Sequence, residues 1–138
     1  MMIQLKVKTE YSFGQTFAPI PRLIERLQAI GARAAGIVDS STWGHVRWFK
    51  ACKEAGIQPL LGAEVIVTDG DETPTRMWFL ARSEEGLRAL YRATSASHHD
   101  PFKSKYGERP RLRRADVMAL GEEVFKFAGE VLDGPWLQ

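Results

Sequence analysis

The chain has 138 residues, of which 44% are hydrophobic and 26% are charged, and its formal net charge is +2. These values are typical of a soluble globular domain, and the small net charge does not by itself indicate a nucleic-acid binder. The single cysteine, Cys52, excludes an internal disulfide and fits a reducing cytoplasm. No apolar run approaches the roughly 20 residues that cross a membrane. The lack of asparagine beside plentiful arginine suggests a thermophilic source.

In the first half of the chain, the hydrophobic periodicity predicts strands that alternate with helices. Period-2 alternation predicts a strand over 3–7, and apolar residues at helical spacing predict a helix that starts at the Pro19 and Pro21 pair and ends at Gly31. A short apolar run over 34–38 predicts a buried strand, and a longer one over 60–67 predicts another. The segment between these two runs predicts a second helix.

This second helix is expected from about Trp43 to Ala55, with Gly56 closing it. Its buried stripe is assigned to Val46, Phe49 and Cys52. On that assignment Arg47 and Trp48 point outward, where they are candidate interface anchors, or Trp48 fills space against a neighbouring helix. His45 is expected near the exposed start of the helix.

The second half predicts a turn over 68–74, a strand over 77–81, and a helix capped by Ser83. An irregular polar stretch over 95–111 follows, then a short helix over 115–120 and a last strand over 124–128. The order predicts one domain, residues 1–138, of the α/β class, with about five mostly parallel strands and three to four helices. Trp136 is expected to cover an open sheet edge or to anchor a partner.

Successive stretches of the sequence resemble one known family. LKVKTEYS, IVDSSTWG, FKACKEAGIQPLLGAEVIV, FLARSEEGLRALYRATS and PRLRRADV resemble, in this order, the PHP (polymerase and histidinol phosphatase) domain at the N-terminus of the bacterial DNA polymerase III alpha subunit. The resemblance implies a distorted β/α barrel whose strand ends hold divalent metals that hydrolyse phosphate esters. It covers about the first half of such a barrel, so we expect a partial PHP-type barrel.

The metal-ligand positions implied by the resemblance are largely substituted. The family's His-x-His motif falls on Lys6 and Lys8, its acidic loop ligand on Gln15, and its Asp-His pair on Asp39 and Ser40, whereas Glu64 keeps the ligand type. Protonated lysine offers only donors and cannot ligate a cation. We therefore expect no metal, no cofactor and no catalysis, and we expect Asp39 and Glu64 to form ion pairs with the two lysines.

A basic, aromatic segment stands out in the second half. It indicates a contact surface for nucleic-acid phosphates or for an acidic protein, or else a solvated loop. Its candidate residues are Phe102, Lys103, Lys105, Tyr106, Arg109, Arg111, Arg113 and Arg114, and on the second helix the candidates are Trp43, Arg47 and Trp48.

Three functions remain open from the sequence. The first is an inactive PHP-derived module that binds protein and regulates a polymerase, either host RNA polymerase or the replicative DNA polymerase, as a phage-encoded factor would. The second is a divergent metal-dependent phosphoesterase that uses Asp39, Glu64 and the loop histidines His98 and His99. The third is nucleic-acid binding through the basic segment.

Overall fold

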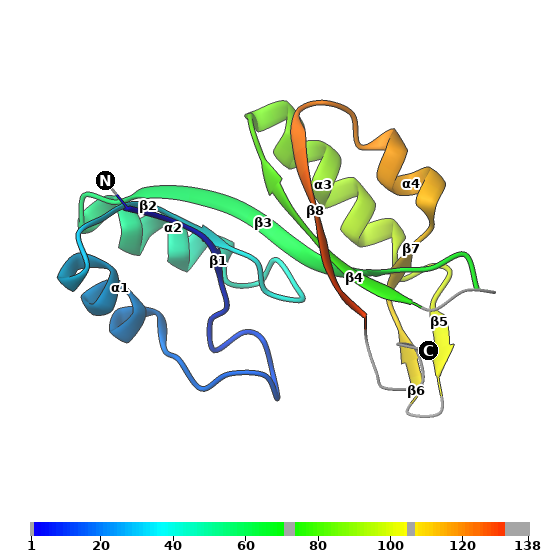
Figure 1. Ribbon diagram of the computed structural model, residues 1–138, viewed down its shortest axis with the longest axis horizontal. Coiled ribbons are helices and arrows are strands. Elements are labelled where there is room, and N and C mark those ends of the chain that lie inside the picture. The colour runs from blue at the N-terminus through cyan, green and yellow to red at the C-terminus, as the bar shows by residue number, and fades with distance from the viewer. Residues whose placement is uncertain (1, 71–73, 105–106, 132–138) are drawn as a thin grey trace. The chain divides into compact units, whose positions relative to one another are not determined.

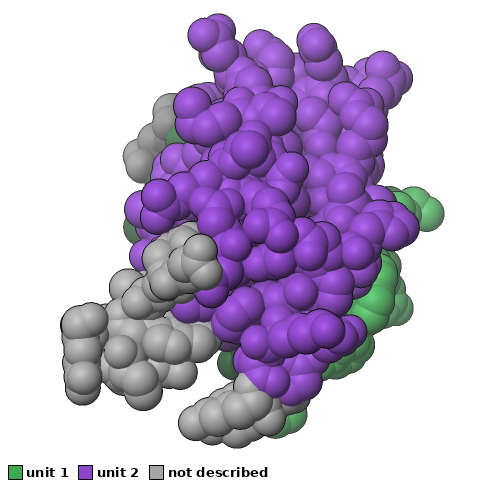
Figure 2. Space-filling view, turned by 90° about the vertical axis from the view of Figure 1, so that its right-hand side faces the viewer, with its two compact units in different colours: residues 1–63 green, residues 64–138 purple. Residues whose placement is uncertain are grey.

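The computed structural model describes residues 2–70, 74–104 and 107–131 and divides the chain into two compact units, residues 1–63 and 64–138. Figures 1 and 2 show the elements and the units. The elements are β1 (Met2–Val7), α1 (Ile20–Ala29), β2 (Ala32–Ile37), α2 (His45–Glu54), β3 (Gln58–Val67), β4 (Thr75–Ala81), α3 (Glu84–Ala96), β5 (Phe102–Ser104), β6 (Gly107–Arg109), β7 (Arg111–Leu112), α4 (Arg114–Ala119) and β8 (Val124–Val131).

The first unit is a parallel sheet with two helices. β2 lies between β1 and β3 and pairs with both in the parallel sense. Parallel strands need crossover connections, and α1 and α2 supply them. β2 is built mainly of small residues, of which Ala34 and Ala35 are buried, so both helices can approach it. β1 is less covered, because Ile3 and Leu5 are 48% and 41% exposed.

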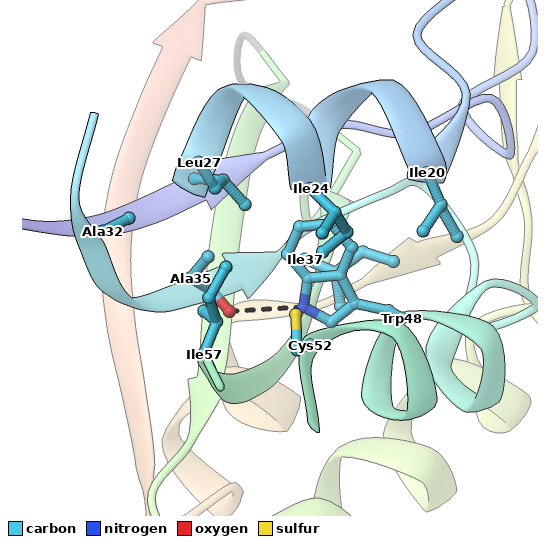
Figure 3. Close-up of a cluster of buried hydrophobic side chains, with 9 residues drawn as sticks. All are labelled: Ile20, Ile24, Leu27, Ala32, Ala35, Ile37, Trp48, Cys52 and Ile57. Carbon is cyan, nitrogen blue, oxygen red and sulfur yellow. Dashed lines mark hydrogen bonds between the residues drawn. The ribbon is translucent and has the colours of Figure 1, made fainter. Parts of the chain in front are cut away.

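The core of the first unit lies between the helices and β2 (Figure 3). The amphipathic face of α1 contributes Ile20, Ile24 and Leu27, as its spacing predicts. From α2, Trp48 and Cys52 enter the same cluster with no exposed surface. Burial raises the pKa of the Cys52 thiol to about 11, so at neutral pH it is an unreactive core residue.

Local signals placed the helix ends correctly. Gly56 follows α2 with φ of +73°, a left-handed conformation that glycine adopts without steric cost. Its N–H donates to the carbonyl of Lys53, and the N–H of Ile57 donates to that of Cys52, which satisfies carbonyls at the end of the helix. Ser83 caps α3, as predicted, by accepting a hydrogen bond from the Gly86 N–H at 3.2 Å.

The second unit is a mixed sheet covered by α3 and α4. β4 and β8 pair antiparallel, and β7 pairs with the end of β3 in the parallel sense. Its core is built around Phe79, Leu90 and Leu112, which are almost fully buried. The stretch over 95–111 was predicted to be irregular, but it holds the β5–β6 hairpin and the first residue of β7. The periodicity did not predict these strands, because they are too short to show a long hydrophobic alternation.

One glycine of α3 provides a test of this packing. Gly86 to alanine would favour the helix by about 1 kcal/mol on propensity alone. However, a Cβ at Gly86 would lie 1.9 Å from the backbone oxygen of Glu123, so the helix or the backbone must move. We expect Gly86→Ala to lower the free energy of unfolding by about 3 kcal/mol in urea denaturation. The exposed Arg92→Ala in the same helix should change it by less than about 0.5 kcal/mol, and a stabilised Gly86→Ala variant would contradict the close packing.

Candidate functional site

Asp39 follows β2 and is fully buried. Its Oδ1 accepts hydrogen bonds from the Thr9 N–H at 2.6 Å and from the Ser12 hydroxyl at 2.5 Å, and its Oδ2 accepts one from the Thr9 hydroxyl at 2.5 Å. Thr9 and Ser12 are also fully buried. The carboxylate therefore fixes the loop after β1 against the end of β2, and its charge is stabilised by three donors.

The other substituted positions of the first unit do not restore a metal site. Gln15 donates from Nε2 to the Ser40 hydroxyl at 3.0 Å, so two positions that the resemblance assigns to metal ligands bind each other. Lys6 lies on β1 and Lys8 just after it, and an ammonium group cannot ligate a cation. Within the residues that the structure describes, no three His, Cys, Asp or Glu side chains are grouped to hold a metal ion. Among residues 2–70, 74–104 and 107–131, the donors do not fit a divalent metal cluster.

Asp39 is held by hydrogen bonds and not by the ion pairs that the sequence predicted with Lys6 and Lys8. Its partners among the described residues are hydroxyl and amide donors, because the loop after β1 folds back onto the strand end. Glu64, in the second unit, is 5% exposed, and Arg76 of β4 reaches it with Nε 3.8 Å from Oε1. Burying a carboxylate is costly unless a cation pairs with it.

His45 is 3% exposed, so the expectation of an exposed position at the start of α2 is wrong. Its Nε2 lies 2.7 Å from the carbonyl oxygen of Gly62, so Nε2 carries the proton and donates it. Burial lowers the pKa of His45 below its ordinary value of 6.5, although the Gly62 carbonyl and the Asp39 carboxylate act in the opposite direction. The buried imidazole is thus held neutral.

This environment predicts a pH dependence of stability. Because the pKa of His45 is lower in the folded chain, the unfolded chain binds more protons in acid, and stability is lost as the pH falls below about 6.5. The loss is at most about 1.4 kcal/mol per pH unit, and it ends at the folded-state pKa. Urea unfolding between pH 7 and pH 5 should show a smaller loss for His45→Gln. The Met118→Ala variant, which changes an exposed residue without a titrating group, should keep the wild-type slope; equal slopes in all three proteins would contradict the assignment.

The orientation of α2 also differs from the prediction. Trp48 is fully buried, with its indole N–H donating to the Ala35 carbonyl at 3.2 Å. It is therefore not an exposed anchor, and it fills space in the core beside α1, which was the other expectation. Val46 and Phe49, assigned to the buried stripe, are 66% and 44% exposed. A tryptophan that also satisfies its N–H gains more from burial than valine does. Trp43 is 66% exposed.

Three arginines of the basic segment, Arg111, Arg113 and Arg114, pair with acids of their own unit. The Asp100 carboxylate forms ion pairs with the guanidinium groups of Arg111, with Nη2 and Oδ1 3.0 Å apart, and of Arg113, with Nη2 and Oδ2 2.7 Å apart. The backbone N–H of Arg113 donates to the Asp116 carboxylate at 2.8 Å. The two guanidinium groups hold the pKa of Asp100 below its usual range. Arg114 forms an ion pair with Asp69, with its Nε 3.8 Å from Oδ2. These contacts join the end of α3, β7 and the start of α4, which reduces the charge available to a phosphate backbone.

Phe102, Lys103 and Arg109 lie on the β5–β6 hairpin. Lys105, Tyr106 and Trp136 lie outside the described residues. Sequence reasoning did not identify Thr9, Ser12 and Arg76, which surround the two acids. The hydroxyl residues of the loop after β1 were the available signal, since buried carboxylates recruit such donors.

The profile of the PHP domain matches residues 4–135, and the chain belongs to the PHP family. Two relatives are DNA polymerase III alpha subunits. That of Halalkalibacterium halodurans is 29% identical over 105 residues, which is 75% of this chain and 9% of the relative. That of Neisseria meningitidis serogroup A is 32% identical over 99 residues, 70% of this chain and 9% of the relative. The chain thus spans about a tenth of these proteins.

Solved structures show the same fold. A protein of Bifidobacterium adolescentis assigned as a metal-dependent phosphoesterase is 22% identical, with a TM-score of 0.50 over 70% of this chain and 34% of that one. An amidohydrolase of Chromobacterium violaceum is 23% identical, with a TM-score of 0.55 over 70% of this chain and 33% of that one. The mixed α/β fold therefore matches part of a PHP-type barrel, as expected. No helix within the described residues is long and apolar enough to cross a membrane.

Proposed function

We propose that this PHP domain has lost hydrolysis and acts by binding a protein. The supporting observation is Asp39, the acid that keeps the family's ligand type after β2. Both of its oxygens accept hydrogen bonds from Thr9 and Ser12, and it is fully buried. A carboxylate in that state stabilises a loop, whereas a catalytic metal needs several such ligands and an open coordination position.

The proposal is tested by hydrolysis and metal content together. We expect no turnover of bis-p-nitrophenyl phosphate or of single-stranded DNA with Mn²⁺ or Zn²⁺, and substoichiometric metal after purification. An active PHP phosphoesterase assayed in parallel is the positive control. Metal-dependent turnover that is lost in Glu64→Ala and kept in the exposed Arg92→Ala would establish the alternative, a divergent phosphoesterase.

For the partner, we propose a polymerase. The support is homology, because the two relatives are subunits of DNA polymerase III and contain a region similar to this chain. On this proposal the PHP domain docks on a replicative DNA polymerase or on a host RNA polymerase in the cytoplasm and alters its activity, as a factor encoded by a phage or mobile element would. Surface plasmon resonance against both purified enzymes tests this, and binding to neither would reject the polymerase as partner.

A further inference from the structure

α2 presents an apolar stripe to solvent in the first unit. Trp43 lies in the turn before the helix, and Val46 and Phe49 follow at intervals of three residues. Their exposed fractions are 66%, 66% and 44%. The opposite face of α2 is seated in the core through Trp48 and Cys52, so the helix does not depend on the stripe for its position. Large exposed apolar residues grouped in this way mark interaction sites.

The loop after β1 extends this stripe. Phe13 is 71% exposed, and the centre of its ring lies 5.8 Å from the centre of the Trp43 ring. Tyr11 accepts a hydrogen bond from Arg47 at 2.9 Å, which ties the loop to α2. Three hydrogen bonds to Asp39 hold Thr9 and Ser12 of the same loop. The surface is therefore ordered before any partner arrives, which reduces the entropic cost of binding.

The charges beside the stripe are mainly positive. Lys50 and Lys53 follow Val46 and Phe49 by four residues and thus lie on the same side of the helix. The Lys53 ammonium lies 5.6 Å from the centre of the Phe49 ring. α2 carries three cationic side chains, Arg47, Lys50 and Lys53, against one acid, Glu54. Charge complementarity thus favours an acidic partner.

We propose that this surface, composed of Phe13, Trp43, Val46, Phe49, Lys50 and Lys53, binds an acidic amphipathic helix of a partner protein. Trp43, Val46 and Phe49 follow the start of α2 over about two turns, with Phe13 of the loop beside Trp43, and a partner helix can lay its own apolar stripe against them. Glutamate or aspartate on the flanks of the partner helix would meet the two lysines. The inference rests on the proposed protein-binding function and names the chemistry of the partner.

The test uses two fluorescent 16-residue helical peptides with the same Leu/Phe stripe, one with glutamates and one with lysines on its polar face. In fluorescence polarisation with the full chain, we expect the acidic peptide to bind at least tenfold more tightly in low salt. Phe49→Ala should weaken its binding about tenfold. Lys50→Glu/Lys53→Glu should reverse the preference between the peptides. The preference should disappear in 1 M NaCl, where the Debye length is about 3 Å.

Met118→Ala is the matched control, because Met118 is 78% exposed on α4 and should leave the affinity unchanged. Equal affinity for both peptides, or unchanged binding by Phe49→Ala, would overturn the proposal. A dimer in multi-angle light scattering that Phe49→Ala dissociates would assign the surface to a second copy instead. None of these three results bears on hydrolysis, so the loss of this inference leaves the hydrolysis assay to decide whether the domain has lost catalysis.

Discussion

Replacing Asp39 by alanine is expected to lower the free energy of unfolding by about 3 kcal/mol or more, the cost of leaving several buried donors without an acceptor. The donors are the Thr9 N–H, the Thr9 hydroxyl and the Ser12 hydroxyl, all in residues with no exposed surface. Urea denaturation followed by circular dichroism measures the change. If Asp39 held a metal instead, chelation with EDTA would lower the melting temperature of the wild-type protein, and we expect no such change.

Ser40→Ala provides the control for this result. Ser40 is the next residue, it is exposed, and its hydrogen bond from Gln15 lies at the surface. Its removal should change stability by less than about 0.5 kcal/mol. Thr9→Val removes one hydroxyl donor and keeps the backbone donor, so an intermediate loss is expected. An Asp39→Ala variant as stable as Ser40→Ala would contradict the structural role of the carboxylate.

Trp48→Ala is expected to cost about 4 kcal/mol, because it leaves a large cavity in the core of the first unit. The residue has no exposed surface, and its indole N–H donates to the Ala35 carbonyl. Trp48→Phe should keep most of the packing and lose that hydrogen bond, for a smaller cost. Thermal and urea unfolding measure both variants.

Trp43→Ala separates stability from binding. Trp43 lies five positions before Trp48 and is 66% exposed, so its removal should change stability by less than about 0.5 kcal/mol. The same substitution should weaken the binding of the acidic peptide. Equal destabilisation by the two tryptophan variants would mean that α2 is rotated relative to the described orientation.

The orientation of α2 shows where periodicity was insufficient. His45, Trp48 and Cys52 form one stripe at helical spacing, and Val46, Phe49 and Cys52 form a competing one. Both stripes contain an aromatic residue and Cys52, so they differ mainly in the third residue, valine or histidine. Because valine is the more hydrophobic of the two, the prediction chose the wrong stripe. The choice depended on two acceptors outside the helix, the carbonyls of Ala35 and Gly62, which a local window does not contain.

Long-range partners explain the remaining differences as well. The resemblance located Asp39 at a strand end, but the residues that bind it lie 27 and 30 positions earlier. The arginines after residue 110 formed a cluster in the sequence, whereas Asp69 and Asp100, which neutralise them, lie outside it. Helix ends at Gly56 and Ser83 were predictable, because a cap depends on neighbours within a few residues.

The position of Cys52 gives the chain an internal reporter of local opening. It is the single thiol of the sequence, and it lies in the core of the first unit. An alkylating reagent can reach it only when that unit opens, so the labelling rate in the native state measures the free energy of that opening. Comparison with global unfolding followed by circular dichroism would establish whether residues 1–63 open independently of the rest of the chain.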